Sequence, residues 1–334
     1  MRIGNFFYLL PIVLFIFSCS KGKNADDLDY VMREELLMDT IISIRIPESP
    51  QANNIINSVF EEFKRIENKF SKSIESSVVY KINNRNTDIV KIDKEEEFIL
   101  KKSFEYNKIT EGYFDITVFT IGQFWDFNLS EDSNVLNSLK KSEENFKYVG
   151  TSNIFFDSGT IGFKNKFIKI DLGGIAKGYA IDRAVEILKN NNISGAVINA
   201  GGDVFVVGKK NKTENWNIAI QDPDNTENYL KILNLYDKNA ATSGDYQRYV
   251  FFENKYYCHI FNPKTGKNSD FLRSATVVYD TALISDIIAT AVIASETEYK
   301  TLIKKILEIH PDMIIYVKNK ENDRLEEYFN SKKI

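Results

Sequence analysis

The chain has few of the residues on which disulfide-bonded proteins and zinc proteins depend. Its 334 residues include two cysteines, Cys19 and Cys258, and two histidines, His259 and His310. No group of cysteines and histidines has the spacing of a zinc site. The formal net charge is −4, and an acidic chain is a poor partner for nucleic acid. The sequence also contains no internal repeat and no low-complexity linker.

Long hydrophobic runs are absent apart from a short one at the N-terminus. Arg2 precedes an apolar run from Phe6 to Phe17. The run is too short to span a membrane as a helix, and it has the layout of a signal peptide. Its ending, Ile16-Phe17-Ser18-Cys19, resembles a bacterial lipobox. We therefore expect residues 1–19 to be a lipoprotein signal peptide with lipid on Cys19. The alternatives are an ordinary cleaved signal or an uncleaved anchor.

This N-terminus predicts where the protein is found and how the chain is divided. Removing residues 1–19 removes one arginine and brings the formal net charge to −5. Residues 20–32 are polar and suit a tether. Residues 33–334 are enough for one large domain or two lobes with a substantial core. We expect a lipoprotein of a bacterial cell membrane that faces the periplasm or the exterior, in which Cys258 has no partner for an internal disulfide.

The spacing of apolar residues predicts helices and strands that are intermixed along the chain. Helices are expected over 52–70, 95–110, 177–190, 286–294 and 298–309. Strands are expected over 40–46, 196–207, 216–221 and 249–261, and paired strands over 154–170. The order lacks the strict alternation of a doubly wound sheet, so the predicted fold class is α+β. His310 precedes Pro311 near the end of the last helix and is expected to be structural.

The most informative segment is KIDLGGIAKGYAIDRAVEIL, residues 169–188. A β-branched run enters the pair Gly173-Gly174, and an amphipathic helix follows. Such a junction presents unpaired N–H groups and the positive end of a helix dipole to an anion. Asp171 and Lys177 flank the glycines. Most glycine turns before helices are only turns, so the phosphate-site interpretation depends on the rest of the chain.

Further glycine-rich, polar and aromatic clusters accompany this segment. They are GYFDIT at 112–117 with FWDF at 124–127, INAGGD at 198–203, TSGDY at 242–246 with CHIFNPKTG at 258–266, and SDIIAT at 285–290. Aromatic residues beside an acid suit a planar ring with a polar edge, although they also suit a corner of the core.

Two of these clusters contain candidate catalytic or metal-binding side chains. Asp286 and Thr290 are four residues apart and share one helix face. A carboxylate and a hydroxyl are hard ligands that suit Mg²⁺ together with phosphate oxygens. The alternative is an N-cap Asp286 and a Thr290 that only packs. His259 leaves a strand into the turn at Asn262-Pro263, which places it at a rim rather than in the core.

Taken together and in this order, the segments resemble the ApbE family, the FAD:protein FMN transferases. The resemblance covers about residues 36–295, and its most specific part is the pairing of DLGG…KGYA with HIFNPKTG. It implies a two-lobed single catalytic domain over 33–334, with the flavin site between the lobes. It also implies Mg²⁺ held by Asp286, Thr290 and the carbonyl of Gly174, with His259 and Asp286 as the catalytic residues. The implied FAD site is lined by Met38, Ser73, Tyr113, Phe114, Asp115, Asp171, Lys177 and His259.

The chain departs from the family pattern at four positions. Asp39 replaces the usual glycine after the first Met, and Ser73 stands where many members carry an aromatic residue that covers the flavin. Ala289 stands where some members have a second acid, which leaves Mg²⁺ with fewer protein ligands. Asn262 replaces the common Asp, a mild change because both residues favour turns.

The implied activity is Mg²⁺-dependent transfer of FMN from FAD to a Thr or Ser hydroxyl of an exported redox protein, with release of AMP. His259 is a candidate general base, and the base remains unassigned. Acceptors of the family carry a D-x-x-(S/T)-G-A-(S/T)-like segment, which Asp157–Gly162 matches only as far as Thr160. The acceptor is therefore expected to be another protein. An FAD pyrophosphatase that yields FMN and AMP and a non-catalytic flavin-binding lipoprotein are the alternatives.

Overall fold

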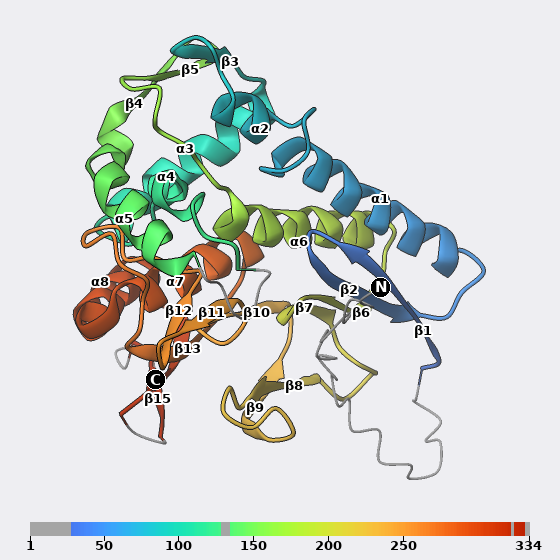
Figure 1. Cartoon of the computed structure of the whole chain (residues 1–334). Helices are drawn as coiled ribbons and strands as arrows, with labels where there is room; N and C mark the ends of the chain where they lie inside the picture. Colours follow the sequence, from blue (N-terminus) through green and yellow to red (C-terminus); the bar gives the residue numbers. More distant parts are fainter. Residues whose placement is uncertain (1–27, 128–133, 322–323, 331–334) are drawn as a thin grey trace, which may run out of the picture.

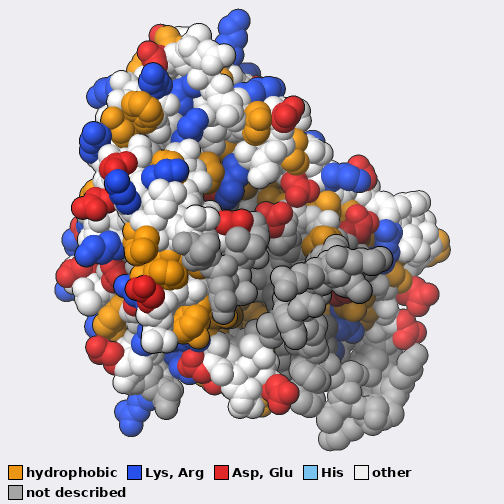
Figure 2. Space-filling view, in the orientation of Figure 1, with side chains coloured by type: hydrophobic (Ala, Val, Ile, Leu, Met, Phe, Trp, Pro, Cys, Tyr) orange, Lys and Arg blue, Asp and Glu red, His pale blue; other side chains and the backbone are white. Residues whose placement is uncertain are grey.

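The computed structural model describes residues 28–127, 134–321 and 324–330. The predicted signal peptide with Cys19 and most of the predicted tether lie outside the described residues. Among the residues that are described, no helix is both long and apolar enough to cross a membrane. On the face shown in Figure 2, basic and acidic side chains are interspersed over the described surface.

An eight-stranded antiparallel sheet forms the centre of the fold, with the strand order β1-β2-β6-β7-β10-β13-β14-β15. Its strands are β1 (Tyr30–Leu37), β2 (Thr40–Pro47), β6 (Gly195–Ala200), β7 (Asp203–Gly208), β10 (Lys238–Gly244), β13 (Leu272–Tyr279), β14 (Ile314–Asn319) and β15 (Leu325–Tyr328). Smaller sheets are formed by β3 (Ile89–Lys91), β5 (Thr160–Phe163) and β4 (Ile154–Asp157), by β8 (Trp216–Gln221) with β9 (Tyr229–Leu235), and by β11 (Tyr249–Phe252) with β12 (Lys255–Cys258).

Helices cover one face of the large sheet, and the β8–β9 hairpin lies on the other side (Figure 1). The helices are α1 (Ala52–Phe70), α2 (Val78–Asn83), α3 (Lys94–Ile109), α4 (Phe119–Gly122), α5 (Val135–Asn145), α6 (Gly173–Asn190), α7 (Ala282–Ala294) and α8 (Tyr299–Ile309). Short 3-10 turns are η1 (Ile116–Val118), η2 (Phe146–Tyr148), η3 (Thr151–Asn153) and η4 (Glu296–Glu298). The main core lies between α1, α6, α7 and the inner face of the sheet, and a second apolar cluster joins β8 and β9 to the outer face.

The predicted α+β class is confirmed, and α1 covers the predicted residues 52–70. Its apolar residues recur every three or four positions, and these side chains are buried. Helix α3 begins at a capping box in which Asp93 and Glu96 satisfy each other's backbone N–H groups. Helix α7 begins at Ala282 rather than at the predicted Asp286. Asp286 is therefore inside the helix and not an N-cap.

Two segments that each predict one continuous strand are hairpins instead. Residues 196–207 form β6 and β7, joined at Gly201-Gly202, whose φ angles are +62° and +100°. Residues 249–261 form β11 and β12, joined at Glu253-Asn254, both also with positive φ. Two-residue hairpin loops of type I′ need positive φ at both positions, so they favour glycine and asparagine. The apolar runs were real strand signals, but these turn residues divide them.

The last part of the expected strand pair at 154–170 is also not a strand. Sheet pairing ends at Phe163, although Ile168 and Ile170 are completely buried. Side chains supply the hydrogen bonds that a neighbouring strand would give. Asn83 binds both backbone groups of Ile170, with 2.8 Å for each bond. Thr120 does the same for Lys169. The sequence pattern therefore predicted the burial of this segment correctly, but its prediction of sheet pairing was wrong.

Candidate functional site

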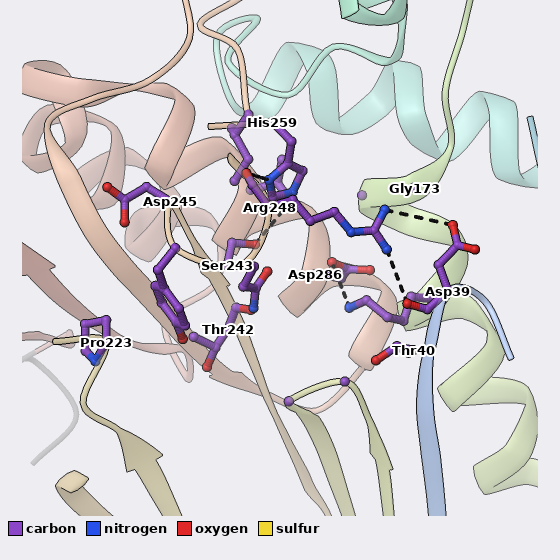
Figure 3. A pocket seen from close by; sticks show the side chains of 18 of the residues that line it. Asp39, Thr40, Gly173, Pro223, Thr242, Ser243, Asp245, Arg248, His259 and Asp286 are labelled. Atoms are coloured by element: carbon purple, nitrogen blue, oxygen red, sulfur yellow. Dashed lines mark hydrogen bonds and ion pairs between the residues drawn. The ribbon is translucent and has the colours of Figure 1, made fainter. Parts of the chain in front are cut away.

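One cavity of about 1620 Å³ lies between the helices and the ends of the central strands. It contains every described site residue that the sequence predicts. These are Met38, Ser73, Tyr113, Phe114, Asp115, Asp171, Gly174, Lys177, His259, Asp286 and Thr290. They come from the β1–β2 turn, the segments before α2 and α4, the start of α6, the end of β12 and the middle of α7. Residues distant in the sequence thus surround one space (Figure 3).

Helices α6 and α7 cross closely at one wall of this cavity. A Cβ on Gly178 would come within 2.7 Å of Leu283 Cα, so the crossing requires a residue without a side chain. Four residues earlier, a Cβ on Gly174 would lie 3.2 Å from Thr290 Oγ1. Asp286 Oδ2 accepts a hydrogen bond from the Gly178 N–H at 3.1 Å. Asp286 and Thr290 therefore face the first turns of α6.

A carboxylate from α6 caps the start of α7 and supports this crossing. Asp182 accepts hydrogen bonds from the N–H groups of Ala282 at 2.7 Å and Leu283 at 3.0 Å. Burial raises the pKa of Asp182 to about 6 in spite of these bonds. The sequence did not single out Asp182, because its partners are 100 and 101 residues away.

The oxygen groups at the crossing fit a hard divalent cation. The described residues contain no cluster of three carboxylate, imidazole or thiolate groups that could hold a metal ion. The candidate donors are instead one carboxylate, one hydroxyl and one carbonyl, from Asp286, Thr290 and Gly174. Such an all-oxygen set suits Mg²⁺, which keeps several water ligands and is commonly held by only one or two carboxylates. Thr290 Oγ1 is also 3.4 Å from Ser243 Oγ, which links α7 to the end of β10.

Lys177 points into the same corner and is held by two buried carboxylates. Its ammonium is in direct contact with Asp203 Oδ2 and lies 3.6 Å from Asp286 Oδ1. Asp203 Oδ1 accepts a hydrogen bond from the Thr242 N–H at 2.9 Å. Asp203 had no predicted role, although it ends the glycine cluster at 198–203.

The aromatic cluster before α4 forms a buried wall. Tyr113 and Phe114 are almost fully buried, and the Lys264 ammonium lies 3.7 Å from the centre of the Tyr113 ring. Asp115 Oδ1 accepts hydrogen bonds from the Thr117 N–H at 2.8 Å and the Thr117 hydroxyl at 2.6 Å. Burial raises the pKa of the Asp115 carboxyl, and these hydrogen bonds oppose the rise. Asp115 thus shapes the turn and contributes to the cavity lining.

Two ion pairs involve residues of the cavity lining that lie far apart in the chain. Lys72 Nζ is 2.5 Å from Asp171 Oδ2, and Asp171 Oδ1 accepts from the Gly173 N–H at 2.9 Å. The Arg248 guanidinium extends toward Asp39, with 3.9 Å between Nη1 and Oδ2 (Figure 3). Asp39 has a φ of +59° in the β1–β2 turn. The sequence did not predict either partner, Lys72 or Arg248.

His259 directly follows β12 and is partly exposed. Its Nδ1 is 3.2 Å from the Arg248 carbonyl oxygen. A proton on Nδ1 donates to that oxygen and leaves Nε2 as an acceptor. Desolvation, with the charges of Arg248 and Lys72, lowers the pKa of His259 to about 4. The imidazole is therefore neutral at pH 7.

The chain is similar to known proteins over most of its length. The model of the ApbE family matches residues 38–311. A protein of Buchnera aphidicola named FAD:protein FMN transferase is 27% identical over 289 residues, which are 84% of each chain. One of the same name from Chlamydia pneumoniae is 27% identical and covers 87% of this chain and 91% of its own. The crystal structure of the ApbE protein of Thermotoga maritima superposes with a TM-score of 0.80 and 29% identity, over 91% of this chain and 98% of that one.

Proposed function

The chain belongs to the ApbE family, and from this premise we propose that it is an enzyme that transfers FMN from FAD to a hydroxyl group of another protein. The observation that carries the proposal is the pairing of Asp286 and Thr290 on α7 with the first turns of α6, inside a cavity that His259 also lines. Oxygen ligands for a divalent cation and an imidazole that can accept a proton are groups that assist cleavage of a diphosphate.

The cavity is large enough for two substrates. Its volume of about 1620 Å³ exceeds the usual range for small-molecule pockets, about 300–1,000 Å³. Tyr113 and Phe114 offer aromatic surface to a planar ring of FAD. The start of α6, with Asp171 and Lys177, suits the diphosphate and the ribose hydroxyls beside it. The remaining space admits an acceptor segment.

We propose that the carboxylate of Asp286, the hydroxyl of Thr290 and the carbonyl of Gly174 hold Mg²⁺. When bound, the cation neutralises phosphate oxygens and so stabilises charge that develops during transfer. The single carboxylate follows from Ala289, which provides no second acid. The N–H of Gly178 fixes the orientation of Asp286 toward the cavity.

In the proposed transfer, a Thr or Ser oxygen of the acceptor attacks the phosphorus on the FMN side of FAD. A new P–O bond forms to the acceptor, the bond from that phosphorus to the bridging oxygen breaks, and AMP leaves with the bridging oxygen. The hydroxyl proton passes to a base. A diphosphate beside His259 would raise the lowered pKa of the imidazole, and Nε2 then becomes a suitable acceptor for this proton.

Hydrolysis of FAD is the second candidate, and Ser73 is the observation that favours it. This serine lines the cavity and is exposed, so it provides no aromatic cover for a flavin ring. If water replaces the acceptor hydroxyl, the same geometry yields free FMN and AMP.

The natural acceptor is proposed to be an exported redox protein, and the enzyme is proposed to be held at the bacterial membrane, on its periplasmic or outer side, by lipid on Cys19. The test is to incubate the protein with FAD, Mg²⁺ and exported redox proteins and to measure the intact mass of each. A mass increase of one FMN on an acceptor, with one AMP per event, supports transfer. Free FMN with no modified acceptor supports the pyrophosphatase instead.

A further inference from the structure

We propose that Asp203 is a positioning residue that holds the Lys177 ammonium away from Asp286 and so keeps Asp286 available to a divalent cation. The inference rests on the proposed function, because it concerns the metal-binding corner of that site. It assigns a role to a residue that touches neither FAD nor the acceptor in the account above.

Asp203 is fixed where it can do this. The Gly201-Gly202 turn returns the chain so that Asp203 pairs with Ala200 at the start of β7. The residue is only 1% exposed. One carboxylate oxygen accepts the Thr242 N–H from the neighbouring strand β10. The other oxygen is buried without a hydrogen-bond partner and has the Lys177 ammonium as its ion-pair partner.

Lys177 lies between two carboxylates that differ in what else they can bind. Its ammonium touches Asp203 and stays 3.6 Å from Asp286 Oδ1. The Asp203 and Asp286 side chains are 2% and 6% exposed, while that of Lys177 is 23% exposed. Asp286 has an N–H donor on its second oxygen, and it faces Thr290 and Gly174. The ammonium is therefore drawn toward the carboxylate that has no metal-binding neighbours.

Electrostatics makes this placement important. An ammonium in full contact with Asp286 would repel a divalent cation and occupy the oxygen that the cation needs, and such interactions are strong where water is excluded. Asp203 gives the ammonium a nearer partner. If the Asp203 charge is removed, Asp286 becomes the only carboxylate within ion-pair distance of Lys177 among the described residues.

The experiment measures Mn²⁺ binding by electron paramagnetic resonance, without FAD, on the full chain and on three variants. Asp203→Asn keeps the shape and removes the charge, and it should raise the half-saturating Mn²⁺ concentration about tenfold or more. Lys177→Met should bind Mn²⁺ more tightly than the unmodified protein. Asp203→Asn/Lys177→Met removes both charges and should bind within a few-fold of the unmodified protein.

The double variant separates this role from the others that Asp203 could have. If Asp203 were itself a metal ligand or only a structural residue, loss of Lys177 would not restore binding, and that result would overturn the proposal. Unchanged binding in Asp203→Asn would overturn it too. If Asp203→Asn does not fold, as judged by circular dichroism, Lys177→Met decides the question, since weaker or unchanged binding contradicts competition. Normal Mn²⁺ results without AMP release from FAD would contradict the proposed function and leave this inference standing.

Discussion

The carboxylate of Asp286 accepts a hydrogen bond from the backbone N–H of Gly178, and this bond joins α7 to α6 where the two helices approach closely. The oxygen that would bind a cation and the helix turn that would bind a diphosphate are therefore parts of one rigid contact. Gly178 permits the close contact because glycine has no side chain. The Asp286 carboxylate adds a hydrogen bond to this contact.

Gly178→Ala should separate the helices. The added Cβ would collide with the backbone of Ala282 and Leu283, which cannot move as a flexible side chain would. We expect a loss of about 1–3 kcal/mol in the free energy of unfolding, as for other overpacked sites, and weaker Mn²⁺ binding. Chemical denaturation measures the first and paramagnetic resonance the second.

Gly122→Ala is the matched control, because a Cβ there would approach only side chains, the nearest at 3.4 Å on Phe261. It should change stability little. Equal losses in the two glycine variants would show that the α6–α7 contact is not specially tight.

Replacing His259 should alter how stability depends on pH. The pKa of His259 is lowered from 6.5 to about 4 in the folded protein. Between these two values the unfolded chain binds more protons than the folded protein does. The contribution of the neutral imidazole to the free energy of unfolding is therefore present above pH 6.5. It is lost as the pH falls toward 4. His259→Gln should flatten this part of the curve of unfolding free energy against pH. An unchanged slope would mean that the imidazole is not desolvated.

His259 should contribute more to the turnover of FAD than to the stability of the fold. His259 lies at the rim of the cavity and is partly exposed, so His259→Ala should keep the melting temperature within a few degrees. AMP release should fall by roughly 10²-fold or more, the lower range for loss of a general base. His310 provides the control: its ring nitrogens contact the hydroxyls of Tyr106 and Tyr279, so His310→Ala should lower the melting temperature and leave turnover per folded molecule nearly intact. The reverse pattern would exclude a site role for His259.

Much of this site could be predicted because its residues occur in short segments with typical chemistry. Asp286 and Thr290 are adjacent on a helix face, and Asp171, Gly174 and Lys177 surround one glycine turn. The contacts between segments could not be predicted. Arg248 and Asp39 are 209 residues apart, and nothing local to Asp203 indicates Lys177 as its partner.

The fold, too, could be predicted only where the signal is local to a segment. The helix over 52–70 could be predicted because its own apolar spacing encodes its buried face. The extended segment before α6 could not, because Asn83 and Thr120 provide its hydrogen bonds from elsewhere in the chain. A buried β-branched run indicates that a segment is covered but does not identify the groups that bond to it.

Cys19→Ser should release the protein from membranes. The apolar run that ends at Cys19 predicts lipid on its thiol, and acyl chains bind by burial of apolar surface, which salt does not weaken. The unmodified protein should stay with membranes in high salt and leave them in detergent. The variant should appear in the soluble exported fraction or remain uncleaved. Release of the unmodified protein by salt alone would contradict lipid anchoring.

The most direct test of the central claim is AMP release from FAD in the presence of Mg²⁺, compared between the unmodified protein and Asp286→Ala. Loss of the carboxylate that faces Thr290 and Gly174 should lower the rate by about 10²-fold or more, as for other lost electrostatic groups at reacting centres, and EDTA should have a similar effect on the unmodified protein. Asp157→Ala, on the small β3-β5-β4 sheet and outside the cavity lining, should leave the rate unchanged. Undiminished AMP release by Asp286→Ala, or in EDTA, would contradict the account.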